Sequence, residues 1–212
     1  MNNERIKNIL EWIFCVIIAL IVALLFRYYI GTPTIVQQES MNPTLEQNQR
    51  LLLNRTIRTT HALPQRKDII TFEAPSTTIL KEIELAKSVI ARYEKEPKSF
   101  WEKFNYYVLE IGKKSYIKRV IGLPGEHIKI KDGNVYINDE LLDESNYLKD
   151  GAITDNGKGI CIDLIIPENC IFAMGDNRIE SLDSRAFGCI PLDKIESKVW
   201  IRITPFDKFG KI

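Results

Sequence analysis

The chain has 212 residues, of which 45% are hydrophobic and 27% are charged, and its formal net charge is +1. This mixture of both charge signs with ample apolar residues excludes a disordered chain, and the length fits one domain of ordinary size beside a short anchor. A net charge near zero creates no long-range positive field for holding nucleic acid. We therefore expect a folded domain that binds no nucleic acid.

One membrane-length apolar run lies near the N-terminus. Residues 12–26 carry no charge, and residues 27–30 (Arg-Tyr-Tyr-Ile) add a cation and two aromatic rings suited to a membrane interface. A cleavable signal peptide is the alternative, since Arg5 and Lys7 form a positive start, but no small-x-small site follows before Pro33. The run predicts an uncleaved spanning helix, and the flanking charges favour a cytoplasmic N-terminus only slightly.

Beyond this anchor, the sequence consists mostly of short runs rich in β-branched residues and bounded by Pro, Gly or Asn. Apolar and polar residues alternate on both sides of Asp132-Gly133, which is a strong local hairpin signal. Many short strands separated by turns predict a mainly β fold, either a barrel or a sandwich. The expected strands are residues 34–37, 50–55, 68–72, 115–121, 127–131, 134–138, 160–166, 170–174 and 198–204.

Residues 76–112 interrupt the strand pattern. Their apolar positions recur at spacings of three and four, which predicts a helical hairpin broken at Pro97. The aromatic residues could rest on lipid or on a partner, but the period is that of a simple core face, so we expect the stripe to pack on the β domain. The stripe consists of Ile79, Ile83, Ala86, Ile90, Tyr93, Trp101, Phe104, Val108 and Ile111, and the aromatic cluster of Phe100, Trp101, Phe104, Tyr106 and Tyr107.

The four cysteines lack the spacing of a zinc site, and the chain has only two histidines. Cys15 lies within the anchor. Cys161 and Cys170 flank the turn residues 167–169, so a hairpin could join them in a disulfide or leave them as two buried thiols. Both possibilities are open at this point, and no metal is expected.

Ser40 is a candidate nucleophile, about ten residues beyond the anchor and therefore held near the bilayer surface. A serine needs a base, but His61 lies in a loop and His127 begins a hairpin strand. A lysine can replace histidine if burial lowers its pKa from ~10.4 by two or more units. Lys118 fits because it lies inside the apolar strand pattern of residues 115–121.

Residues 174–188 pack acids, bases and hydroxyls into a run too polar for a core and too irregular for a helix. A solvated loop is one interpretation. The other is a satisfied polar network, with Asp183 and Arg185 paired and Asp176 and Ser181 close by, that fixes a site.

In this order along the chain, the anchor and these segments resemble bacterial type I signal peptidases (leader peptidases), membrane-bound serine proteases of the Ser-Lys type. The resemblance covers nearly the whole chain and rests on residues 40–45, 50–52, 68–72, 116–126, 175–178 and 181–185. It implies a Ser-Lys protease β-barrel or sandwich fold with one N-terminal transmembrane helix. Residues 1–30 would form a cytoplasmic stub and anchor in the cytoplasmic membrane. Residues 31–212 would form the extracytoplasmic catalytic domain, with the helical insertion 76–112.

The resemblance also implies roles for individual residues. Ser40 would attack the scissile carbonyl, Lys118 would take its proton, and Ser181 would orient the lysine amine. The supporting ion-pair network would comprise Asp176, Asp183, Arg185 and Arg119, and the oxyanion and substrate pocket would include Gln38 and Met41. The implied partners are exported preproteins, cut after small residues at −1 and −3, and membrane lipid, without nucleic acid, metal or cofactor.

Three departures from the family pattern leave alternatives open. Gln38 stands where the family usually has a Gly backbone or a Ser/Thr hydroxyl, Ile179-Glu180 replaces an Asp-Asn pair, and the insertion 76–112 is long. One alternative is a specialised signal peptidase for a narrow set of substrates, such as pilin-like surface proteins. Another is a catalytically silent, membrane-tethered binding module. A self-cleaving cytoplasmic regulator is disfavoured by the anchor and by the lack of a basic DNA-reading segment.

Overall fold

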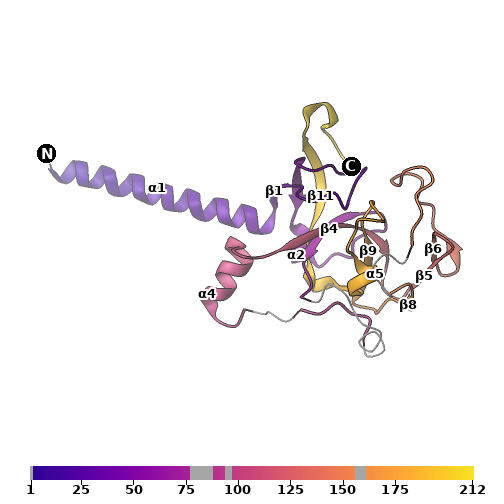
Figure 1. Ribbon diagram of the computed structural model, residues 1–212. Coiled ribbons are helices and arrows are strands. Elements are labelled where there is room, and N and C mark those ends of the chain that lie inside the picture. The colour runs from indigo at the N-terminus through magenta and orange to yellow at the C-terminus, as the bar shows by residue number, and fades with distance from the viewer. Residues whose placement is uncertain (1, 77–87, 94–96, 156–160) are drawn as a thin grey trace.

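The structure is a computed structural model that describes residues 2–76, 88–93, 97–155 and 161–212. A long helix, α1 (Asn2–Tyr29), projects from a domain built mainly of strands (Figure 1). The strands form a seven-stranded sheet in the order β1-β2-β11-β3-β4-β9-β10 and a four-stranded sheet in the order β7-β6-β5-β8. Neighbouring strands pair antiparallel in both sheets. The expected mainly β class is thus confirmed.

The elements of the larger sheet are β1 (Gly31–Ile35), β2 (Arg50–Asn54), β3 (Ile69–Glu73), β4 (Ser115–Gly122), β9 (Cys170–Met174), β10 (Ile190–Pro191) and β11 (Ile195–Thr204). The smaller sheet has β5 (His127–Lys131), β6 (Asn134–Ile137), β7 (Glu140–Leu141) and β8 (Asp163–Ile165). The short helices are α2 (Thr56–Thr60), α4 (Phe100–Lys103), η1 (Phe104–Leu109), α5 (Ser184–Phe187), η2 (Leu192–Lys194) and η3 (Phe206–Lys208).

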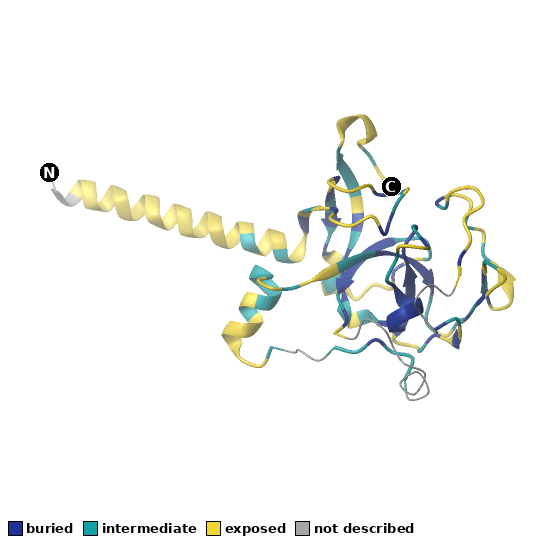
Figure 2. Ribbon diagram, in the orientation of Figure 1, coloured by how far each residue is buried: buried dark blue, intermediate teal, exposed yellow. Residues whose placement is uncertain are grey.

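The apolar core lies around the central strands of the larger sheet. Every residue of β3 and β9 is buried, so these strands lack the polar alternation of a half-exposed strand (Figure 2). β5 and β6 do alternate, with Ile128, Ile130, Val135 and Ile137 turned into the core between the sheets. Burial on both faces of β9 and of residues 118–122 of β4 gives the larger sheet a buried centre.

The structure corrects part of the helical prediction for residues 76–112. Residues 77–87 lie outside the described residues, and residues 88–93 are not helical: Ile90 forms a parallel bridge to Cys189. A three-residue spacing of apolar side chains does not by itself separate a helix from an irregular buried segment. Residues 100–109 are helical as expected, because Ser99 and Glu102 form a capping box at the start of α4 and η1 continues it.

Phe100 and Trp101 of this helical segment do not pack on the β domain as expected, whereas Ile90 and Tyr93 of the same stripe do. Phe100 is 73% exposed and Trp101 is 70% exposed, and no residue of α4 or η1, both described in full, is buried. The segment is tied to the rest of the chain mainly by polar contacts, such as the hydrogen bond from the Tyr106 hydroxyl to Glu73.

One helix among the described residues, Glu4–Tyr29 within α1, is long and apolar enough to cross a bilayer; an 18-residue stretch of it has a mean hydropathy of 3.0 and no buried residues. Only Ile30 separates α1 from β1, so the helix runs almost directly into the edge strand of the larger sheet. The apolar helix is therefore compatible with membrane anchoring.

All four cysteines are described, and all are free. Cys161, Cys170 and Cys189 lie in one buried apolar cluster, where burial raises the pKa of the Cys161 and Cys170 thiols to about 11. Of the two possibilities left open by the sequence, the structure therefore has the buried thiols.

Candidate active site

Ser40 and Lys118 are in contact at the edge of the buried centre of the larger sheet. Lys118 lies in β4, paired opposite Ile70 of β3, and Ser40 lies in the turn that follows β1. Lys118 Nζ donates a hydrogen bond of 2.6 Å to Ser40 Oγ, and Lys118 is only 1% exposed. The turn is fixed because Met41 and Leu45 are buried in the adjacent core cluster.

Burial lowers the pKa of Lys118 from 10.5 to about 8. Nearby Asp183 and Asp176 oppose this change by favouring the ammonium form, whereas Arg185 favours the neutral amine. Burial has a larger effect on the pKa than the two carboxylates, because the side chain enters an apolar site from a central strand. About half of this lysine is therefore uncharged at about pH 8, and more of it above that pH, as proton abstraction requires.

Asp183 and Arg185 form a fully buried ion pair behind the serine and lysine. Arg185 donates from Nε to Asp183 Oδ1 and from Nη2 to Oδ2, both at 2.9 Å. Burial alone would raise the pKa of Asp183, but the hydrogen bonds and charge of Arg185 lower it. Asp183 also accepts from the backbone N–H of Gly175 at 3.1 Å, so the pair holds the chain that follows β9.

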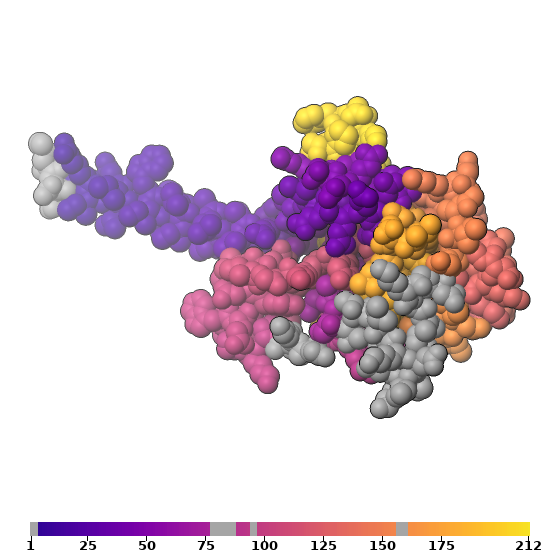
Figure 3. Space-filling view, viewed as in Figure 1, coloured from indigo at the N-terminus to yellow at the C-terminus, as the bar shows by residue number. Residues whose placement is uncertain are grey.

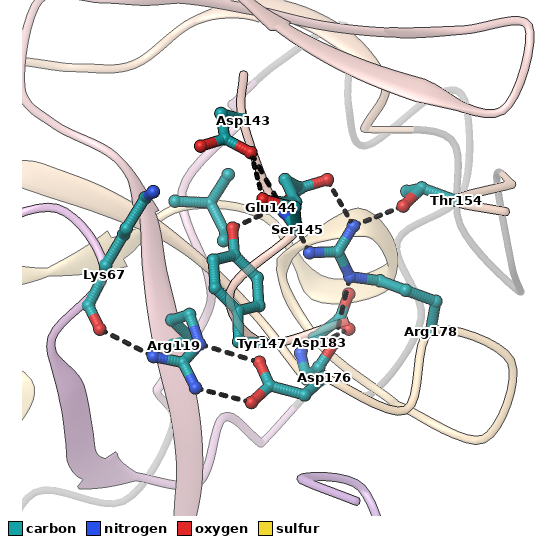
Figure 4. A network of polar contacts seen from close by, with 12 residues as sticks. Lys67, Arg119, Asp143, Glu144, Ser145, Tyr147, Thr154, Asp176, Arg178 and Asp183 are labelled. Carbon is teal, nitrogen blue, oxygen red and sulfur yellow. Dashed lines mark hydrogen bonds and ion pairs between the residues drawn. The ribbon is translucent and has the colours of Figure 1, made fainter. Parts of the chain in front are cut away.

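A second buried pair joins β4 to the same loop (Figure 4). Arg119 donates two hydrogen bonds to Asp176, from Nε at 2.8 Å and from Nη2 at 2.6 Å. Its Nη1 donates to the carbonyl of Lys67 at 2.9 Å, and its guanidinium lies 4.2 Å from the centre of the Tyr147 ring. Arg119 follows Lys118 directly in β4. The ion pair with Asp176 therefore fixes the backbone next to the lysine.

No role was predicted for Arg178, although the structure makes it a member of the same network. Arg178 Nη2 lies 2.5 Å from Glu144 Oε1, its Nη1 bonds the Thr154 hydroxyl, and its Nε donates to the Gly175 carbonyl at 3.1 Å (Figure 4). The signal available in the sequence was its place in the polar run 174–188. Its partners Glu144 and Thr154 come from a distant loop that no local pattern connects to it.

Gly175 allows the serine turn and the 176–183 loop to approach one another. A Cβ atom at this position would overlap both the Ser181 hydroxyl and the Ser40 carbonyl oxygen. The Ser40 carbonyl also accepts from the Asn177 N–H at 3.0 Å. Glycine is therefore needed here for close packing around the serine.

Ser181 does not make the contact that the resemblance implied. Its hydroxyl contributes to lowering the pKa of Asp183, yet within the described residues it forms no hydrogen bond of ordinary geometry with Asp183 or with Lys118. It lies close to the site, as its proximity to Gly175 shows, but its orienting role is not formed in this conformation.

A groove of about 610 Å³ opens beside Ser40. One wall comes from β1 and the turn after it, including Gln38 and Met41, and the other from residues 115–117 of β4. Gln38 is exposed, whereas Met41 is only 1% exposed. Glu110, near the end of the insertion, and Lys113, just after it, line the groove as well. Within the described ranges, no group of three or more His, Cys, Asp or Glu side chains could hold a metal ion.

The chain is similar to several known proteins. The family model for signal peptidase, peptidase S26, matches residues 9–204. Signal peptidase I P of Bacillus subtilis subsp. natto is 31% identical, covering 100% of this chain and 99% of that protein. Signal peptidase IB of Staphylococcus aureus (strain COL) is 30% identical, covering 96% and 93%. A solved signal peptidase I from Enterococcus faecalis V583 is 25% identical, with a TM-score of 0.40, covering 65% of this chain and 97% of that chain.

A model match over most of the chain, together with relatives at 30% identity or more over nearly its full length, establishes the class of this enzyme as a serine protease. The chain belongs to the signal peptidase family, peptidase S26. The silent binding module considered from the sequence is thereby disfavoured.

Proposed function

We propose that this protein is a membrane-anchored endopeptidase that removes signal peptides from exported preproteins, with Ser40 as nucleophile and Lys118 as general base. The observation that carries the proposal is the 2.6 Å hydrogen bond between Lys118 Nζ and Ser40 Oγ, made by a lysine whose pKa burial lowers to about 8. A nucleophile within hydrogen-bond reach of a neutral base is the arrangement that serine attack requires.

The reaction proceeds through an acyl-enzyme. As Ser40 Oγ attacks the scissile carbonyl, its proton passes to the neutral amine of Lys118. The resulting ammonium then gives a proton to the leaving amine of the mature protein. In the second half, Lys118 takes a proton from water, which attacks the ester, and the proton returns to Ser40 Oγ as the signal peptide leaves. Asp183 and Asp176 favour the transient ammonium, since their charges oppose the lowering of the lysine pKa.

The developing oxyanion requires donors beside Ser40. We assign the backbone N–H of Ser40 and an amide of Gln38, because Gln38 lies two residues before the serine and lines the groove. Asp176, Asp183, Arg119 and Arg185 act as positioning residues through the two buried ion pairs. Ser181 would orient Lys118 after its side chain changes rotamer and brings Oγ to the lysine amine.

The substrate lies in the groove between β1 and β4, where Met41 and the surrounding residues leave space near Ser40 for small side chains at −1 and −3. Residues 1–30 form the cytoplasmic stub and single membrane span, and residues 31–212 form the extracytoplasmic domain. The near-direct junction of α1 with β1 supports this division, because it holds the groove beside the bilayer from which a signal peptide emerges.

The test is cleavage of a purified preprotein by the full chain in detergent. Ser40→Ala and Lys118→Ala should each abolish cleavage, whereas Lys129→Ala, which removes a half-exposed lysine of β5, should cleave at the wild-type rate. Mass spectrometry of the products should show small residues at −1 and −3. Undiminished cleavage by either active-site variant would contradict the assignment.

A narrow substrate set is the second candidate, favoured by the way the insertion reaches the groove. Glu110 and Lys113 place charges in its wall, and Lys113 pairs with Glu196 at 2.5 Å. A panel of precursors separates the two possibilities, because a general enzyme should process most of them and a dedicated peptidase only one type, such as pilin-like precursors.

A further inference from the structure

The exposed aromatic side chains of α4 and η1 form a surface that neither the fold nor the reaction uses. We call Phe100, Trp101 and Phe104 the aromatic patch. Their rings touch edge to face, with centroids 5.5 Å apart for Phe100–Trp101 and 6.2 Å apart for Trp101–Phe104. Three contiguous rings with two of them about 70% exposed are costly in water, so this surface indicates an apolar occupant.

The patch is held beside the end of α1. Glu110, which closes η1 in the left-handed conformation, lies 3.1 Å from Arg27 near the end of α1 and 2.5 Å from Arg55. The Arg58 guanidinium stacks 4.7 Å from the centre of the Tyr28 ring and 5.8 Å from that of Tyr107. Figures 1 and 3 show the segment on the side of the β domain from which α1 emerges.

The depth of this junction follows from the length of the apolar run. Residues 12–26, bounded by Glu11 and Arg27, make about 22 Å of helix, which is shorter than the ~30 Å hydrocarbon core. Arg27 therefore lies at the membrane boundary and not above it. Its ion pair with Glu110 reduces the cost of holding a cation there, and the charges of Arg55 and Arg27 outweigh burial and lower the pKa of Glu110.

We propose that the aromatic patch is a second membrane contact, which inserts into the lipid interface beside α1 and fixes the tilt of the β domain on the bilayer. Aromatic rings favour this interface, and the exposed Lys98 and Lys103 flank the patch as cations suited to anionic headgroups. With α1 alone, the domain could tilt about one attachment; a second contact sets the direction in which the groove opens.

Three single-tryptophan forms of the full chain, reconstituted in phosphatidylcholine–phosphatidylglycerol vesicles, test the proposal. The first retains Trp101, the second retains Trp12 in α1, and the third carries Leu141→Trp, an exposed position of β7 on the smaller sheet; all other tryptophans are Phe. Brominated lipids should quench Trp101 and Trp12 and leave the Leu141→Trp reporter unquenched, whereas aqueous acrylamide should show the reverse order.

The outcomes separate this inference from the anchor on which it rests. Quenching of Trp12 by lipid, with Trp101 as open to acrylamide as the Leu141→Trp reporter, would overturn the second contact and leave the anchor intact. A Trp12 that lipid does not quench would remove the anchor and the inference together.

An activity ratio gives an independent measurement. The double variant Phe100→Ser/Trp101→Ser should lower the ratio of vesicle-embedded precursor cleavage to soluble-peptide cleavage by roughly tenfold or more, because two rings no longer enter lipid. The matched control Leu141→Ser/Ile165→Ser removes two equally exposed apolar side chains from the smaller sheet and should leave the ratio unchanged. Equal ratios for both double variants would overturn the proposal.

Discussion

Lys118→Met should stabilise the fold while abolishing activity. A pKa lowered from 10.5 to about 8 means that folding disfavours the ammonium form of Lys118 by about 3 kcal/mol. Methionine has a similar length and carries no charge, so this cost disappears. Against it stands the lost hydrogen bond to Ser40, worth about 1 kcal/mol. The expected net gain in the free energy of unfolding is about 2 kcal/mol at pH 7.

The stability gained by Lys118→Met depends on pH, and the direction of this dependence follows from the lowered pKa of Lys118. Below about pH 8 the lysine is protonated in both the folded and the unfolded chain, and the full cost of the buried charge is present. Between about 8 and 10.5 the unfolded chain binds a proton that the folded chain does not, so the wild type becomes more stable as pH rises. The advantage of Lys118→Met should therefore shrink across this interval and vanish by about pH 10.

Urea unfolding of the full chain in detergent, followed by far-ultraviolet circular dichroism at pH 7 and pH 10, measures both effects. Lys129→Met is the matched control, since that lysine is half-exposed on β5. A Lys118→Met variant that is less stable than the wild type at pH 7, or a stability gain that is the same at both pH values, would refute the reasoning.

Three further predictions concern the same site. Peptide cleavage should increase as pH rises through about 8, because Lys118 must lose its proton; a kcat/KM profile flat from pH 6 to 9 would contradict this. Gly175→Ala should lower kcat by roughly 100-fold, because the new Cβ displaces the serine turn, and an unchanged kcat would exclude that steric role. Asp176→Ala should cost about 3–5 kcal/mol of stability by leaving Arg119 buried without its carboxylate, as denaturant midpoints would show. The control Asp163→Ala removes an exposed carboxylate and should cost about 1 kcal/mol or less of stability. Equal losses of stability for Asp176→Ala and Asp163→Ala would contradict the prediction.

The local alternation of polar and apolar residues predicted the strands well where one face of the sheet is exposed. The alternation around Asp132-Gly133 located all of β5 and β6 and extended β6 by one residue, since each polar position faces outward. Pattern was weaker where pairing is nonlocal. β10 has only two residues and exists because Ile190 and Pro191 pair with β9, and the bridge from Ile90 to Cys189 replaced an expected helix.

For the candidate site, Ser40 and Lys118 were predicted from their local context together with the family resemblance, but the distance between their side chains depends on the whole sheet. The buried pairs of Asp183 with Arg185 and Asp176 with Arg119 were expected from charge composition and resemblance. The link from Arg178 to Glu144 crosses from one loop to another, and composition contains no signal for such a pairing.

A single residue connects α1 to β1, so the length of the helix affects both the height and the rotation of the groove. Each residue added within an α-helix advances the following chain by about 1.5 Å and turns it by about 100°. With Ile30 as the whole connection, an insertion of one residue in α1 would swing the β domain around the helix axis. Four added residues would nearly restore its facing while raising it by about 6 Å. The length of the apolar helix thus contributes to the rotation of the groove about the helix axis and to its height above the bilayer.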